Sequence, residues 1–295
     1  FSIGNDLSVY DNGSPFYEQK DTDDVDFYGR VIYSLPSSAE DIFDNWRIYL
    51  PRNYYDFPKS EGKIVDIRYI GQYRTIFRLE NGTFIDQLYT SMESTENTIS
   101  LGSGKMFSKR PEKIVTADNI NVGTNHSLDF VNTPFGAFMA CAELGEVYQF
   151  GTNLQTISSN DAQSWFNENL PFRLSKQIDM KGEHELTAAS GIGLISCFDH
   201  EHKLYILTKK DYELVNPDDR FRYSYKDGQF FFDGKSVDLT DSVHFKDLSF
   251  TIGYSPLSNL WYSFYSFIPD FYMNIGLKIY SGQNATAEVN INAHD

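Results

Sequence analysis

His200, Glu201 and His202 are the part of this 295-residue sequence that comes closest to a metal-binding pattern. In an extended strand, residues two apart face the same side, so His200 and His202 could bind one zinc ion together. The sequence singles out no third ligand elsewhere, and the three residues lie where a polar turn is expected between two apolar runs. We therefore interpret them as a solvated turn.

A second candidate is the carboxylate cluster Asp21, Asp23, Asp24 and Asp26, since Ca²⁺ prefers oxygen ligands. A calcium-binding loop needs a ligand where Val25 stands, and it needs a glycine that is missing here. We predict no calcium site in this cluster.

The stretch SSNDAQSWF, residues 158–166, partly matches the Asp-box motif Ser-x-Asp-x-Gly-x-x-Trp of sialidase-type propellers. Ser159 and Asp161 fit the motif. Gln163 replaces the glycine that permits the turn, and Trp165 comes one residue early. We interpret the stretch as a turn followed by a short segment that packs Trp165 and Phe166.

Other catalytic patterns are also missing from the sequence. There is no Gly-x-Ser-x-Gly elbow, no signature of a cysteine nucleophile and no glycine-rich phosphate loop. Paired carboxylates that meet only in the fold remain open, because acidic residues are plentiful. We predict that the chain is not an enzyme and that it has no catalytic, cofactor-binding or metal residues.

Composition favours strands and turns over helices. The chain has 24 Phe and 20 Tyr, and aromatic residues make up 16% of it. Its 41 acidic and 25 basic residues give a net charge of −16, which repels the phosphates of nucleic acids. No apolar run of about 18 residues occurs, so no membrane segment is predicted. The composition predicts an all-β protein.

Two regions are expected along the chain. Residues 1–62 are polar and turn-rich and predict an N-terminal arm or linker, with a short helix in SSAEDIFDNWRIYL, residues 37–50. Residues 63–295 carry the strand patterns. The chain starts at Phe1 and not at Met, so we expect a processed product or a piece of a longer protein.

Hairpin patterns begin at Lys63. The run 63–85 alternates apolar and polar residues around Gly71 and again around Asn81 and Gly82, and Asn-Gly is a strong hairpin signal. The more basic run 103–119 is interpreted as an excursion between structural units.

One hairpin pattern then recurs three times, at residues 134–158, 189–215 and 248–269. Each copy has a small and apolar strand, a polar turn and an aromatic-rich strand, followed by a second turn and a third strand. The outgoing aromatic residue falls at Tyr148, Tyr205 and Trp261, which are 57 and 56 residues apart. On this alignment Cys141 and Cys197 occupy equivalent sites. We interpret both as buried thiols, with a bridge between adjacent units as the alternative.

A unit of several strands that repeats at this spacing is typical of a β-propeller, in which neighbouring blades stack and bury a shared layer. The spacing predicts a propeller of about five blades, either closed or incomplete. A β-sandwich is the alternative, although sandwich strands seldom repeat one hairpin at constant spacing.

The repeat carries a resemblance to a known family. Its first copy resembles the residue pattern of a propeller blade in tail muzzle or nozzle (tail tubular) proteins of short-tailed, crAss-like phages. A later Trp-x-Ser-Phe and Ile-Pro match as well, and the resemblance covers residues 133–273. The matching residues are Gly136, Val147, Tyr148, Phe150, Leu154, Ile157, Ser158, Trp261, Ser263, Phe264, Ile268 and Pro269.

This resemblance implies a structural protein of the virion, located in the phage tail. Copies would form a ring-shaped homo-oligomer that helps to build the DNA exit channel and docks other tail subunits and neighbouring virion proteins. DNA would pass through without specific binding.

Two alternatives remain at this point. One is a secreted glycan-binding or glycan-hydrolysing propeller, suggested by abundant carboxylates and by the aromatic residues Trp46, Tyr54, Tyr55 and Trp165. The other is a propeller that serves as an interaction scaffold inside a larger protein.

Overall fold

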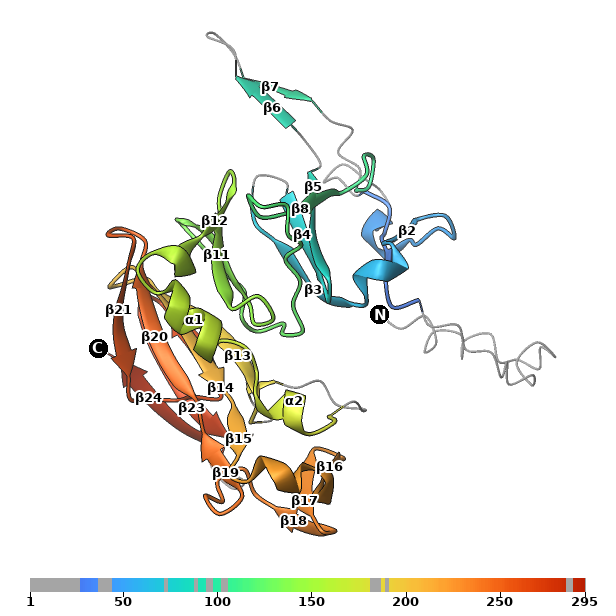
Figure 1. The fold of residues 1–295 in the computed structure, drawn as a ribbon. Coiled ribbons are helices and arrows are strands. Elements are labelled where there is room, and N and C mark those ends of the chain that lie inside the picture. The colour runs from blue at the N-terminus through green and yellow to red at the C-terminus, as the bar shows by residue number, and fades with distance from the viewer. Residues whose placement is uncertain are drawn as a thin grey trace, which may run out of the picture.

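The computed structural model describes most of the chain, namely residues 27–36, 44–71, 74–87, 90–93, 98–101, 106–180, 187–188, 191–284 and 289–294. Antiparallel strands predominate among these residues and form several sheets (Figure 1). The prediction of an all-β protein is confirmed. Helices are short, and they comprise α1 (Gln163–Asn169), α2 (Leu174–Gln177) and the 3-10 turns η3 (Asn45–Arg47), η4 (Lys59–Glu61), η5 (Ile157–Ser159) and η7 (Pro217–Arg222).

Sheet 1 contains four strands in the order β3 (Ile64–Tyr69), β4 (Arg74–Leu79), β5 (Gly82–Gln87) and β8 (Glu112–Ile114). The predicted hairpin at Asn81–Gly82 is confirmed, because Leu79 pairs with Gly82. The excursion predicted at 103–119 is wrong in part, since β8 lies within it and pairs with β5. A separate hairpin of β6 (Thr90–Glu93) and β7 (Thr98–Leu101) lies between β5 and β8 in the sequence.

Sheet 2 follows the first predicted repeat and is a simple meander of β9 (Val131–Thr133), β10 (Gly136–Cys141), β11 (Glu146–Phe150) and β12 (Leu154–Thr156). Gly136 starts β10 with a φ of 118°, and a Cβ there would lie 2.6 Å from the Phe150 carbonyl oxygen. Only glycine fits that position without moving the neighbouring strand.

Sheet 3 corrects the repeat interpretation. It consists of β13 (Gly193–Asp199), β14 (Leu204–Lys210), β20 (Phe250–Ser255) and β21 (Leu260–Tyr265). The second and third repeats, expected in separate units, share this sheet because β14 pairs directly with β20. Residues 211–249, hereafter the insertion, separate these two hairpins and produce the second of the two spacings.

The insertion has its own small sheets. Strand β15 (Tyr212–Leu214), expected beside β14, pairs instead with β19 (Phe245–Asp247). A three-stranded meander lies between them, formed by β16 (Tyr223–Lys226), β17 (Gln229–Phe232) and β18 (Lys235–Val237). Leu214, Phe230 and Phe245 are buried in the main core, so the insertion is part of the packed body.

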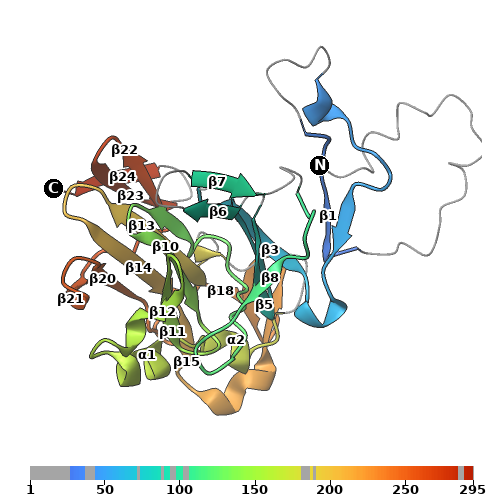
Figure 2. The ribbon, with the colours of Figure 1, turned by 90° about the horizontal axis from the view of Figure 1, so that it is seen from above.

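The sheets stack in a row and share apolar layers (Figures 1 and 2). A short pair of β1 (Arg30–Ile32) and β2 (Tyr54–Asp56) covers the outer face of sheet 1. Sheet 2 covers the other face of sheet 1, and sheet 3 packs on sheet 2. Sheet 4 packs on sheet 3 and contains β22 (Phe271–Ile275), β23 (Lys278–Asn284) and β24 (Val289–His294).

Aromatic rings fill the layer between sheets 2 and 3. Phe138 and Tyr205 stack with ring centroids 4.6 Å apart, and Tyr254 contacts Phe138 edge-on. These side chains are fully buried, and each removes a large apolar area from water. No single sheet could bury both of its faces alone, so the layers depend on one another.

Tyr148 and Tyr205 occupy corresponding places, as predicted, since each faces the preceding sheet. The cysteines do not. Cys141 lies between sheets 1 and 2, whereas Cys197 lies between sheets 3 and 4. A shift of one residue along a strand turns a side chain to the opposite face. The predicted equivalence of the cysteines is therefore wrong, while their assignment as buried free thiols is confirmed.

The described part of the predicted N-terminal arm packs on sheet 1 through Val31 and Phe57. Of the helix expected at 37–50, the structure describes residues 44–50, and these contain only the 3-10 turn η3. Residues 37–43, where the helix was expected to start, lie outside the described residues, so the prediction stays untested there.

A buried ion pair connects the first three sheets. Arg78 of β4 donates from Nη2 to Oδ1 of Asp129 at 2.6 Å, and both side chains are at most 1% exposed. Asp129 Oδ2 accepts the backbone N–H of Ala140 at 3.0 Å. Its carbonyl oxygen accepts the hydroxyl of Ser196 at 2.7 Å. Asp129 thus binds strands β4, β10 and β13 at one point.

The buried environment of Asp129 makes its ion pair with Arg78 important for stability. Burial raises the pKa of its carboxyl, and the opposing charge and hydrogen bond of Arg78 lower it. A buried carboxylate without its cation would be strongly destabilising. The pair therefore sets which strands must meet at this place.

We predict that Arg78→Met lowers the free energy of unfolding by about 3–5 kcal/mol, because it leaves Asp129 buried without a counter-ion. The double variant R78M/D129N should lose less unfolding free energy than R78M alone. It buries no charge, and the oxygen of the new amide at position 129 still accepts the Ala140 N–H. Urea unfolding measures both. The control is Lys63→Met, which removes an exposed pair with Glu80 and should change stability by at most about 1 kcal/mol. Equal losses in R78M and K63M would contradict the prediction.

Candidate functional site

The His200–Glu201–His202 segment is a turn between β13 and β14, as predicted. Asp199 Oδ1 accepts the backbone N–H groups of Glu201 and His202 at 2.8 and 2.9 Å. Its Oδ2 lies 2.8 Å from His202 Nδ1. The Nδ1 atom of His202 is therefore bonded to a carboxylate of its own turn and is not directed at a metal ion. Within the part of the chain that the structure describes, no three His, Cys, Asp or Glu side chains are grouped closely enough to hold a metal ion.

The hydrogen bond and charge of Asp199 raise the pKa of His202 above its ordinary value of 6.5. Any stability from this contact is present at low pH and fades as pH rises through the raised pKa. An NMR titration should show His202 titrating above 6.5. In Asp199→Asn the pKa should fall back, while Asn Oδ1 still caps the turn. An unchanged titration in D199N would contradict this assignment.

The partial Asp-box leads into helix α1, and its aromatic residues pack between elements. The Trp165 ring lies 4.7 Å from Phe250 and 5.0 Å from Phe264, measured between centroids. Phe166 is fully buried and lies 4.5 Å from Trp261. The predicted packing role of Trp165 and Phe166 is confirmed, with a helix where a short segment was expected.

The other aromatic residues considered for glycan binding divide into two kinds. Tyr55 stacks on Phe107 with centroids 4.6 Å apart, so its face is covered. Trp46 is 59% exposed and Tyr54 is 44% exposed. The Arg30 guanidinium lies over the Tyr54 ring, 4.1 Å from its centroid, so of these residues Trp46 offers the most aromatic surface to a ligand.

Several residues that carry the phage-tail resemblance form hydrogen bonds at the end of sheet 2. Ser158 Oγ accepts the backbone N–H of Val147 at 3.2 Å. The indole N–H of Trp261 in sheet 3 donates to the Ile157 carbonyl at 3.0 Å, which connects sheet 3 to the chain that leaves sheet 2. These contacts give the residues a packing role.

The acidic cluster Asp21 to Asp26 lies outside the described residues, so the structure leaves its prediction untested. Among the described helices, none is long and apolar enough to cross a membrane.

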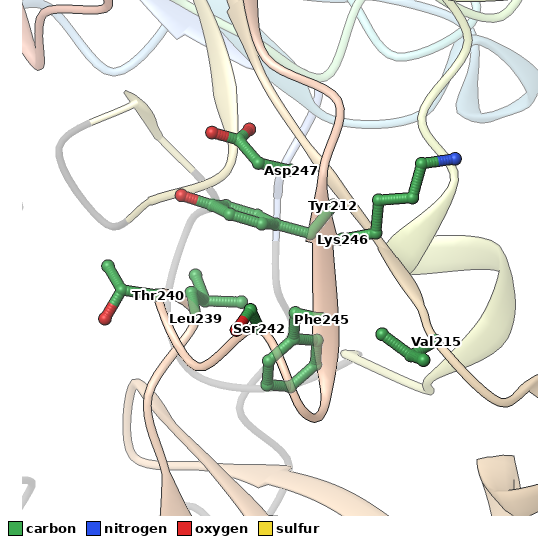
Figure 3. Close-up of a pocket in the computed structure, with 8 residues that line it drawn as sticks. All are labelled: Tyr212, Val215, Leu239, Thr240, Ser242, Phe245, Lys246 and Asp247. Carbon is green, nitrogen blue, oxygen red and sulfur yellow. The ribbon is translucent and has the colours of Figure 1, made fainter.

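The insertion contains a pocket of about 500 Å³ that the sequence did not indicate. Strands β15 and β19 and the loop after β18 provide its lining residues, which are Tyr212, Val215, Leu239, Thr240, Ser242, Phe245, Lys246 and Asp247. In Figure 3 the Tyr212 hydroxyl and the Asp247 carboxylate lie on the same side, and Lys246 points away from them. The pocket therefore combines apolar walls with an acidic edge.

Local hydrogen bonds fix the loop that forms one wall of the pocket. Asp238 Oδ1 accepts both the backbone N–H and the hydroxyl of Thr240, at 2.8 and 2.7 Å. Asp241 continues the pattern, because its carbonyl accepts the backbone N–H groups of His244 and Phe245. Such turns hold the loop in one conformation without a ligand.

The pocket is negatively charged near Tyr212. Burial, together with the charges of Asp247 and Asp238, raises the pKa of Tyr212 to about 12. Its phenol therefore stays protonated at neutral pH and can donate a hydrogen bond. Lys246 forms a 2.7 Å ion pair with Glu213, which offsets its positive charge.

A polar cleft of about 320 Å³ shares Lys246 with this pocket and contains Lys209. The Lys209 ammonium is buried and contacts the carbonyls of Asn169 and Pro171 and the Asp211 carboxylate, at 2.7–2.9 Å. Burial lowers the pKa of Lys209, and Asp211 opposes this effect. Three acceptors match the three N–H bonds of the ammonium, so Lys209 anchors the α1–α2 segment to β14.

No family model matches the chain, and no curated protein matches it. Neither comparison identifies a phage tail protein. The resemblance remains a prediction from the residues.

Sequence reasoning missed the pocket because its residues lie far apart in the chain. Tyr212 and Asp247 are directly opposite each other in the β15–β19 pair. The expected place of β15 beside β14 concealed this pairing. The repeated Asp-x-Thr and Asp-x-Val turns at 238–243 were the available local signal for an ordered loop.

Proposed function

We propose that this chain is a structural virion protein, the propeller module of a tail nozzle or muzzle of a short-tailed phage. Several copies would form a ring at the tail end, extend the DNA exit channel and provide docking surfaces for other tail proteins. In this proposal the module acts through its packed structure, and we propose no enzymatic activity.

The observation that carries the proposal is the row of antiparallel sheets that share buried layers. Blades of a propeller stack in this manner, with each sheet covering its neighbour's apolar face. The Asp129 contacts and the Trp261–Ile157 hydrogen bond fasten successive sheets to one another. Such a body suits a part that must keep its shape while DNA passes.

The net charge also supports this role. Binding to DNA depends on basic side chains that neutralise phosphates, and this chain has a net charge of −16. A channel wall with this charge balance would let DNA slide without retaining it. The same charge favours solubility of the separate chain.

We expect an antibody against the chain to label one end of the tail in particles purified from cultures in which the gene is expressed. Immuno-electron microscopy measures the position, and antibody pre-absorbed with the purified chain is the control. Labelling in several copies per particle at the tail end is the expected result. Particles that lack the chain would contradict the proposal.

A second candidate function is glycan binding, and the exposed ring of Trp46 favours it. Aromatic faces of this kind can stack on sugar rings. A glycan array would show binding that Trp46→Ala abolishes and that Trp165→Phe, at the packed tryptophan, leaves intact. An array on which the chain binds no glycan would remove this candidate.

A further inference from the structure

Phe221 is the most exposed large hydrophobic side chain of the described residues, at 83%. It lies on the 3-10 turn η7 of the insertion. Arg222, the next residue, holds this turn through Asp219 at 3.1 Å and through Asp233, whose Oδ1 lies 3.1 Å from its Nε. Asn216 contributes a bond from Nδ2 to Asp219 at 2.7 Å. The aromatic ring therefore stands in water on an ordered support.

An exposed ring on an ordered support loses little conformational freedom when it is buried by a partner. Aromatic side chains of this kind are frequent anchors at the centre of protein interfaces. Two further exposed apolar side chains, Val215 and Val243, lie in the same insertion, at 54% and 74%. Three large apolar side chains of the insertion are thus open to contact with a partner.

The pocket of the insertion has the size and chemistry to receive such a ring. Its volume of about 500 Å³ exceeds the roughly 150 Å³ of a protein cavity that binds benzene. Leu239 and the 54% exposed Val215 offer apolar contacts, and the buried Tyr212 and Phe245 line the pocket from the core side. Phe221 does not line the pocket of its own chain.

Charges favour the same match. The Arg220 guanidinium lies over the Phe221 ring, 4.6 Å from its centroid, and would travel with the ring into an interface. The receiving pocket has an acidic edge at Asp247, with Asp238 and Asp241 in the adjoining loop. The turn that carries the ring also contains Asp218 and Asp219, and Asp219 is paired with Arg222. The charge of Arg220, directly over the ring, would meet the charge of Asp247 beside the pocket.

We infer that copies of this chain bind one another by inserting Phe221 of one copy into the pocket of the next copy. Each copy carries one ring and one pocket, so the contact is head-to-tail, and such contacts close into rings when the rotation allows. This inference rests on the proposed function and names the surface that would hold its ring together.

Sedimentation equilibrium of the full chain over a range of concentrations tests the contact with two variants. Phe221→Asp removes the ring, and Val215→Arg places a charge at the pocket's exposed side. Each should weaken self-association at least about tenfold, as loss of an interface hot spot does. Leu257→Asp is the matched control, because Leu257 is 68% exposed but lies in the β20–β21 turn, and it should associate as the unaltered chain does. Circular dichroism confirms that each variant is folded.

Mixing the two weakened variants gives the sharpest result. F221D retains a free pocket and V215R retains a free ring, so an equimolar mixture should form a complex of two chains and nothing larger. If the unaltered chain associates but F221D associates equally well, the inferred contact is overturned and the ring of the proposed function stands. An unaltered chain that is monomeric at every concentration would overturn both.

Discussion

The buried contact between Arg78 and Asp129 is the constraint on which the stacked sheets depend. A carboxylate without exposure to water requires a partner for each oxygen, and Arg78 and the Ala140 backbone N–H provide them. The Asp129 carbonyl adds the hydroxyl of Ser196. Because these groups come from three sheets, Asp129 keeps all of these hydrogen bonds only while the three sheets hold this relative arrangement. The apolar layers provide the attraction between the sheets, and the contacts of Asp129 determine how the sheets are positioned relative to one another.

Lys209 and Asp211 form a second buried ion pair that joins separate segments, at the start of the insertion. Their contacts fix the α1–α2 segment against β14, and the insertion continues from Asp211. The pocket and the exposed Phe221 are therefore held on a firmly attached module and not on a free loop. This attachment makes the insertion a suitable place for contacts between copies, and it connects the packing of the body to the proposed assembly.

Local patterns predicted the strands well. The Asn81–Gly82 turn, the meander of sheet 2 and the turn at His200 follow from short-range preferences, which the sequence displays directly. The pairings between segments that are distant in the chain could not be predicted from the sequence. Strands β14 and β20 join across the insertion, and Arg78 meets Asp129 across 51 residues. No periodicity specifies such partners, because any apolar strand edge can accept another. The cysteines show a finer limit, since a shift of one residue reversed the face of Cys197.

Hydrogen exchange under native conditions tests most directly whether the stacked sheets form one body held by Asp129. The backbone amides of Ala140 in sheet 2 and Ser196 in sheet 3 are both bonded to the 128–129 segment. Both should exchange only through global unfolding, with the same free energy as the Arg78-containing strand β4. Exchange of one sheet at a clearly lower free energy than the others would show that the sheets open independently and would contradict this account.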